Sequence, residues 1–116
     1  MSPLASAIYR QLLRRVRSPQ KSITYAALAK EISKKHPVHH RGRTLYAALT
    51  EVTEACRAAH LPLLPAIVWR AGARHPSDGF FALAYPRATT VKARMQAWQR
   101  DHEAVVAHAA NYPATL

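Results

Sequence analysis

Apolar residues recur along this chain at the spacing of amphipathic helices, and prolines stand at the ends of these helical stretches. The first stretch, within residues 1–17, predicts a helix from about Pro3 to Val16 with Ser2 as its N-cap. Pro19 then disfavours helical geometry at the residue before it, so we expect the helix to end there. This periodicity indicates a mainly helical fold.

A helix-turn-helix-like segment is expected over residues 24–60. Thr24 is a good N-cap for a short amphipathic helix that ends near Lys34 or Lys35, and a turn-rich connection follows it. The next apolar stripe predicts a third helix from about Arg43 to His60. Two helices joined in this way are typical of proteins that place a helix in a groove of DNA.

The sequence takes on the character of strands after the third helix. Two short apolar runs, Leu64 to Trp69 and Gly79 to Tyr85, flank a loop with Gly and Pro residues, and this predicts a β-hairpin wing over 64–85. A long C-terminal helix is expected over 89–111. The predicted fold class is therefore α+β, a single winged helix-turn-helix-like domain over 1–116 that is mainly helical.

The charge of the chain is strongly positive. Seventeen Lys and Arg residues stand against six Asp and Glu, which gives a formal net charge of +11. Ten of these cations fall between Arg10 and Arg43, where the only acid is Glu31. Such a surface is typical of proteins that bind nucleic acid, DNA more than RNA here, because cations at the phosphate backbone release counterions. An acidic protein partner, or no charged partner at all, is the alternative interpretation.

One edge of the predicted third helix carries hydrogen-bonding and basic side chains at helical spacing. Arg43 and Tyr46 are the most specific candidates for contact. An arginine near the start of a recognition helix can reach a base, and a tyrosine can stack or contact phosphate. A solvated basic face is the alternative interpretation of the whole set. The candidate nucleic-acid contacts are Arg41, Arg43, Tyr46, Thr50 and Arg57 on or beside the third helix, Lys34 and Lys35 in the turn, Arg70 and Arg74 in the wing, and Arg10 and Arg14 on the first helix.

The residue types that catalysis or metal binding requires do not come together in the sequence. Cys56 is the only cysteine and falls on the packed face of the third helix, where an apolar setting keeps a thiol inert. His36, His39 and His40 lack a nearby cysteine and the spacing of a helical ligand pair. We therefore expect no enzyme activity, no cofactor and no metal. An enzyme acting on a nucleic-acid base, the rival interpretation, would need an activated nucleophile or a metal.

The cysteine count and the distribution of apolar residues bear on the compartment and assembly of the protein. A single cysteine cannot form an internal disulfide, and no apolar run has the length of a signal peptide or a membrane span. We therefore expect a cytoplasmic protein without membrane contact. Met95 and Trp98 in the C-terminal helix suit either packing on the core or a homodimer.

Three runs of the chain carry a resemblance to a known family: Ile23 to Ala29, Arg41 to Leu49, and Leu63 to Arg70 with the glycine loop after it. Over roughly residues 22 to 81 they resemble the DNA-binding domain of alkylguanine-DNA alkyltransferases and alkyltransferase-like proteins. The resemblance implies a winged helix-turn-helix shape that binds DNA through a recognition helix.

The motifs of that family match in part. Thr24-Tyr25 and Leu28-Ala29 match its Thr-Tyr-Gly-x-(Ile/Leu)-Ala helix start. Either Arg41 or Arg43 stands for the arginine near the beginning of its recognition helix. Its Pro-Cys-His-Arg active site is absent, because the chain reads Leu63-Leu64-Pro65-Ala66 there. The resemblance therefore implies a DNA-binding architecture without alkyl transfer.

Overall fold

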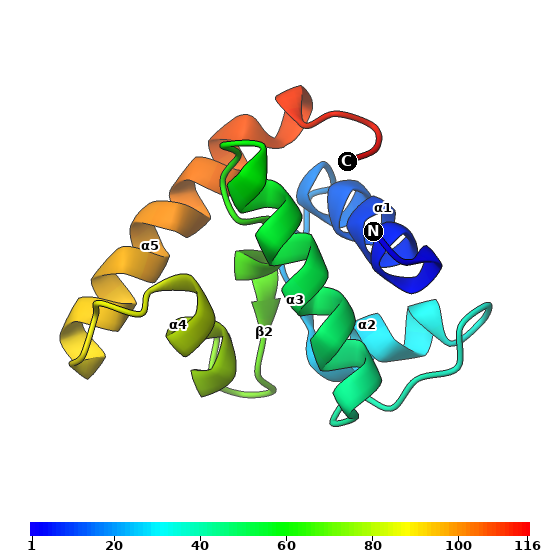
Figure 1. Cartoon of the computed structure of the whole chain (residues 1–116), viewed down its shortest axis with the longest axis horizontal. Helices are drawn as coiled ribbons and strands as arrows, with labels where there is room; N and C mark the ends of the chain where they lie inside the picture. Colours follow the sequence, from blue (N-terminus) through cyan, green and yellow to red (C-terminus); the bar gives the residue numbers. More distant parts are fainter.

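The computed structural model describes all residues, 1–116, as five α-helices and two 3-10 turns around a two-stranded sheet (Figure 1). The chain is of the α+β class, with helices dominant. No helix in it is both long enough and apolar enough to cross a membrane. The elements in chain order are α1 Pro3–Val16, β1 Ile23–Thr24, α2 Tyr25–Ile32, α3 Arg43–Ala58, the 3-10 turn η1 Leu64–Ile67, β2 Val68–Trp69, α4 Asp78–Ala84, α5 Val91–His108 and the 3-10 turn η2 Ala109–Asn111.

Helices α1, α2, α3 and α5 form where apolar periodicity and capping residues predicted them. The side chain of Ser2 accepts a hydrogen bond from the N–H of Ala5 at 3.1 Å, which caps α1. Thr24 accepts from the N–H of Ala27 at 3.2 Å in the same way and caps α2. Each bond satisfies an N–H that helix geometry leaves without a partner.

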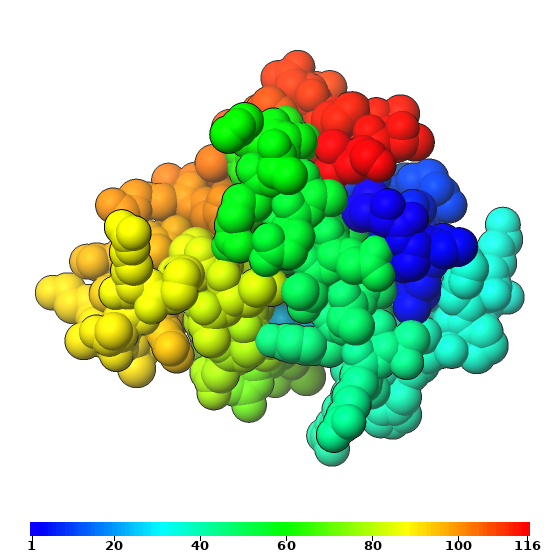
Figure 2. Space-filling model, in the orientation of Figure 1, coloured from blue at the N-terminus to red at the C-terminus, as the bar shows by residue number.

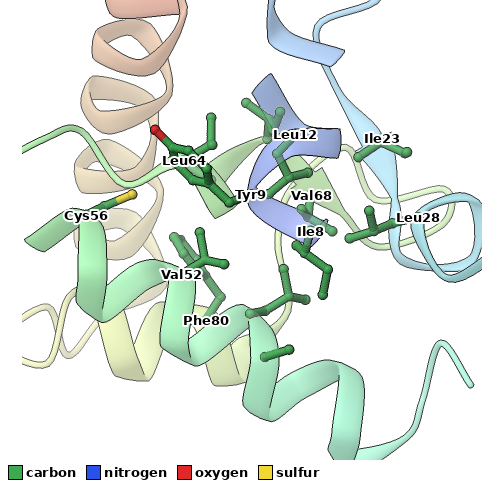
Figure 3. Packing of buried hydrophobic residues seen from close by; sticks show 14 of the residues in the cluster. Ile8, Tyr9, Leu12, Ile23, Leu28, Val52, Cys56, Leu64, Val68 and Phe80 are labelled. Carbon is green, nitrogen blue, oxygen red and sulfur yellow. The ribbon is translucent and has the colours of Figure 1, made fainter. Parts of the chain in front are cut away.

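The apolar run Leu64–Val68 passes through the centre of the core. Its first part, η1, contacts α1, α3 and α5, and the side chain of Leu64 is fully buried. Figure 3 shows Leu64 and Val68 among side chains of the flanking helices, including Leu12 of α1 and Val52 of α3. A segment that is covered on every side is expected to be apolar throughout rather than to alternate.

The two strands of the sheet come from distant parts of the chain and run parallel. Ile23 lies opposite Val68, and Thr24 lies opposite Trp69. Because α2 follows β1 directly, this pairing places the start of α2 beside the loop that follows β2. The pairing thereby allows the start of α2 and the loop after β2 to share a surface with the start of α3.

The prediction of a β-hairpin wing over 64–85 is wrong. Its expected second strand forms α4 instead, and Ser77 caps that helix by accepting from the N–H of Phe80 at 3.4 Å. Phe80 and the adjacent Phe81 both enter the core, whereas neighbouring residues of a strand point to opposite faces. The expected first strand pairs with β1 in parallel and has no hairpin partner. A short apolar run fits helix or strand by sequence alone.

Helix α5 is held to η1 through Trp98. The indole N–H of Trp98 donates to the carbonyl of Ala66 at 3.0 Å, and the side chain is buried. Trp98 is therefore occupied within the chain and is not free to form a dimer contact. A homodimer through α5 stays a prediction that would have to use exposed residues such as Val91.

Candidate nucleic-acid interface

A groove of about 830 Å³ opens at the start of α3, between that helix, the start of α2 and the loop that joins β2 to α4. Figure 2 shows the surface hollowed between the start of α3, in teal, and the α4 segment, in yellow-green. We call this hollow the α3 groove. The lining residues on which the argument depends are Tyr25, Arg41, Arg43, Tyr46, Arg70 and Gly79.

Four of the predicted contacts come together in the α3 groove. Arg43 and Tyr46 belong to the start of α3, Arg41 lies just before it, and Arg70 reaches the same hollow from the loop after β2. All three arginines are exposed, and none of them forms an ion pair. Asp78 is the only acidic residue of the lining. The groove is therefore cationic, with three guanidinium groups against one carboxylate.

The backbone at the start of α3 adds to this positive potential. The N-cap is Gly42, which has no side chain that could accept a hydrogen bond from the first turn. The first N–H groups of a helix carry a partial positive charge and bind anions when they have no cap. Backbone and side chains thus present the same sign of charge to the groove.

Two tyrosines form the inner wall of the groove. The hydroxyl of Tyr25 donates to Ser77 Oγ at 3.2 Å and accepts from the Ser77 N–H at 3.1 Å, which ties the start of α2 to the start of α4. The Tyr46 hydroxyl lies against Gly79, so close that a β-carbon at that position would overlap with the phenol. The side chain of Tyr46 is 43% exposed. Partial burial, with a smaller contribution from Tyr25, raises the pKa of Tyr46.

Two predicted contacts on α3 are used inside the molecule. Thr50 donates to the carbonyl of Tyr46 at 3.0 Å and faces a small cavity beneath the groove. Arg57 donates to the carbonyl of Leu83 at 3.0 Å and to the carboxylate of Glu54 at 3.1 Å. Arg57 therefore binds the end of α4, and it lies about 21 Å along α3 from Arg43 at 1.5 Å per residue.

The remaining predicted contacts are exposed but lie outside the α3 groove. Arg10 and Arg14 are on the side of α1 that faces away from its buried stripe, and Arg14 donates to Gln11. Arg74 is in the loop after β2, where its backbone is left-handed with φ of 57°. Lys34 and Lys35 follow α2.

Other lining residues were missed by sequence reasoning. The sequence predicts Tyr25 as part of the apolar stripe of α2, which gives no signal for its hydroxyl, and it predicts Gly79 in a strand. The signal that could have found them is the run Pro76 to Gly79, in which Ser77 precedes an acidic residue as helix N-caps often do.

Groups with the potential for catalysis are occupied or buried. Cys56 is fully buried, and burial raises the pKa of its thiol, which matches the structural role predicted for it. Ser77 Oγ is bonded to Tyr25 and Phe80, and the ring of His75 faces the carbonyl of Pro76. No three His, Cys, Asp or Glu side chains are grouped so that they could hold a metal ion.

The chain has no detectable relatives among the proteins with which it was compared. No family model matches it, and neither a curated protein nor a solved structure does. The resemblance to the alkyltransferase DNA-binding domain therefore stays an expectation that depends on the short motifs quoted above.

Proposed function

We propose that this protein binds nucleic acid without catalysis, and duplex DNA rather than RNA, with α3 in a groove of the duplex. The observation that carries the proposal is the convergence of Arg41, Arg43 and Arg70 on one groove, none of them ion-paired. Cations held near one another repel, and a polyanion relieves this repulsion and releases its own counterions. A phosphate backbone supplies such an anion.

The use of a helix as the contacting element favours duplex DNA. The major groove of B-DNA is wide enough to admit an α-helix, whereas that of A-form RNA is deep and narrow. In this proposal α2 and α3 act as the helix-turn-helix, as in the alkyltransferase DNA-binding domain that the motifs resemble. Arg70 and Arg74 in the loop after β2 would contact the flanking backbone, which is the role expected of a wing.

The proposal is tested by fluorescence anisotropy of labelled duplex DNA, single-stranded DNA and duplex RNA, with nuclease-treated protein across a salt series. We expect tightest binding to duplex DNA, with an affinity that falls steeply as salt rises. Equal affinity for all three would indicate contact with phosphate alone. Absence of binding to any of them would overturn the proposal.

Two triple variants separate the groove from general positive charge. The control removes the same charge outside the groove, so it should lower only the general electrostatic part of the affinity, which appears as a smaller slope of affinity against salt. The groove variant should lose most of the binding. Equal losses in the two would contradict a role of the groove. The groove variant is Arg41→Ala, Arg43→Ala, Arg70→Ala, and the control is Arg10→Ala, Arg14→Ala, Lys35→Ala.

An acidic protein partner would use the same arginines, and a pulldown separates the two cases. Partners that co-purify through nucleic acid are lost when nuclease is added before the pulldown. A partner that survives nuclease and is released by the groove variant would replace nucleic acid as the ligand of the groove.

A further inference from the structure

A second, much smaller cavity lies behind the α3 groove, and its walls are mainly apolar. Its volume of about 10 Å³ is close to the least that a single water molecule needs. Leu49, Val68 and Phe80 supply apolar wall. The hydroxyls of Thr50 and Thr53, which also line it, donate to carbonyls of α3 at 3.0 Å. The space behind the groove is thus small, and its two hydroxyl groups already donate their hydrogen bonds within α3.

Tyr46 separates the groove from this inner cavity. Its side chain lines both spaces, and so does that of Tyr25. The Tyr46 hydroxyl reaches Gly79, which leaves no room for even one more carbon. Tyr25 is tied to Ser77 by two hydrogen bonds. The two rings form a wall that meets the start of α4 through the hydrogen bonds of Tyr25 and the packing of Tyr46 against Gly79.

The charged mouth and the apolar interior suit different parts of a nucleic acid. Phosphates belong at the arginines, whereas a nucleobase taken out of its duplex needs a slot in which it can stack against apolar or aromatic side chains. The Tyr46 ring lies between the mouth and such surroundings, since Tyr46 lines both spaces whereas Phe80 lines only the inner cavity. We therefore expect truncation of the ring to join the two spaces.

We propose that Tyr46 determines the specificity of the groove: its ring closes the inner end, so that the protein holds the outside of a duplex and does not accept an extruded nucleobase. This inference rests on the proposed function, since it concerns which nucleic acid the same groove takes. Gly79 is the positioning residue for the ring, because it alone leaves space for the phenol at the start of α4.

The first test does not depend on nucleic acid. Indole, a flat ring system of about the size of a purine, is titrated into ¹⁵N-labelled protein while amide shifts are recorded. We expect no saturable shifts in the wild type or in Tyr46→Phe, which keeps the ring. In Tyr46→Ala we expect saturable shifts at Thr53, Val68 and Phe80. Because the Tyr46 side chain is 43% exposed, its truncation should leave the fold intact, which thermal unfolding verifies.

Gly79→Ala is the second variant, and it leaves Tyr46 itself unchanged. The added methyl group overlaps with the phenol and displaces the ring from its seat. The backbone of Gly79 has no positive φ, so alanine adds no backbone strain and its nearest clashes are with the Tyr46 ring. We expect Gly79→Ala to bind indole as Tyr46→Ala does. In a Tyr46→Ala background the Gly79→Ala change should add nothing further.

The second test uses a duplex that carries 2-aminopurine opposite a mismatched base, with a distant label for anisotropy. We expect the wild type to bind without a rise in 2-aminopurine emission, and Tyr46→Ala to bind with a severalfold rise as the base leaves its stack. An equal rise with the wild type, or saturable binding of indole to the wild type, would overturn the role of Tyr46. Failure of every protein to change the anisotropy would refute nucleic-acid binding, and the indole titration would still decide whether the ring closes the cavity.

Discussion

The hydroxyl of Tyr85, at the end of α4, donates a hydrogen bond of 2.7 Å to the carboxylate of Asp101 on α5. The other carboxylate oxygen accepts from the N–H of Leu63, just before η1, at 3.2 Å. One side chain of α5 therefore joins the end of α4 to the segment that enters the core. Since α4 supplies one wall of the α3 groove, this bond helps to hold the groove in shape.

We expect Asp101 to make stability depend on pH. Burial raises the pKa of Asp101 above its ordinary value of 3.8, although the bonds from Tyr85 and Leu63 act in the opposite direction. The folded state then holds the proton more tightly than the unfolded chain, so the free energy of unfolding should fall as pH rises from about 4 through the raised pKa. This contribution is fully present only below the ordinary pKa.

The Asp101→Asn variant tests this expectation. An amide keeps an oxygen for the Leu63 N–H and can donate to the Tyr85 hydroxyl, but it carries no charge. Urea unfolding at several pH values should show the variant gaining stability relative to the wild type as pH rises from about 4 to 7. A difference that is the same at every pH would show that the carboxyl titrates alike in the folded and unfolded states.

Arg43→Ala should weaken duplex binding by about 1–3 kcal/mol if its side chain reads a base edge, and the loss should vary with DNA sequence. Arg14→Ala is the control, because Arg14 is exposed on α1 outside the groove and should change only the salt slope. Anisotropy titrations against a panel of duplexes measure both. Equal losses that do not depend on sequence would refute base readout by Arg43.

Arg57→Ala should reduce the free energy of unfolding by more than it weakens the free energy of duplex binding. The guanidinium of Arg57 satisfies the Leu83 carbonyl at the end of α4, and the loss of such a partly exposed bond costs about 0.5–1 kcal/mol. Arg57→Lys, which keeps the charge without the planar guanidinium, should lose most of the same stability. Denaturant unfolding measures this cost. A duplex affinity that falls as far in Arg57→Ala as in Arg43→Ala would instead make Arg57 a DNA contact.

Ser77→Ala and Thr90→Ala form a matched pair, because both residues cap helices through their hydroxyls. Each change should cost about 1 kcal/mol of stability. Only Ser77 also accepts from the Tyr25 hydroxyl, so only Ser77→Ala should loosen the inner wall of the groove and lower duplex affinity. Thermal unfolding and anisotropy give the two readouts. A loss of affinity in Thr90→Ala of the same size would mean that affinity follows stability and not the wall.

Much of the helical architecture and part of the site could be predicted. The stripes and caps of α1, α2, α3 and α5 involve residues within a few positions of one another, and such local signals depend little on the rest of the fold. Arg43 and Tyr46 share one turn of α3 and Arg41 lies just before it, so their grouping in the groove could be predicted for the same reason. Thr50 and Arg57 fit the same helical edge, yet the hydroxyl of Thr50 bonds back to its own helix and the guanidinium of Arg57 bonds to the end of α4.

The sequence by itself determined the four longer helices, the cationic start of α3 and the burial of Cys56. Only the tertiary structure decided that residues 78–84 form a helix, that Arg70 joins the arginines of α3, and that Tyr46 meets Gly79. The reason is that a short apolar run has no unique period, and that contacts between residues far apart in the chain depend on how β1 pairs with β2 and how α4 packs on the core. Local preference places a residue on a face of its helix, and packing then decides what that face meets.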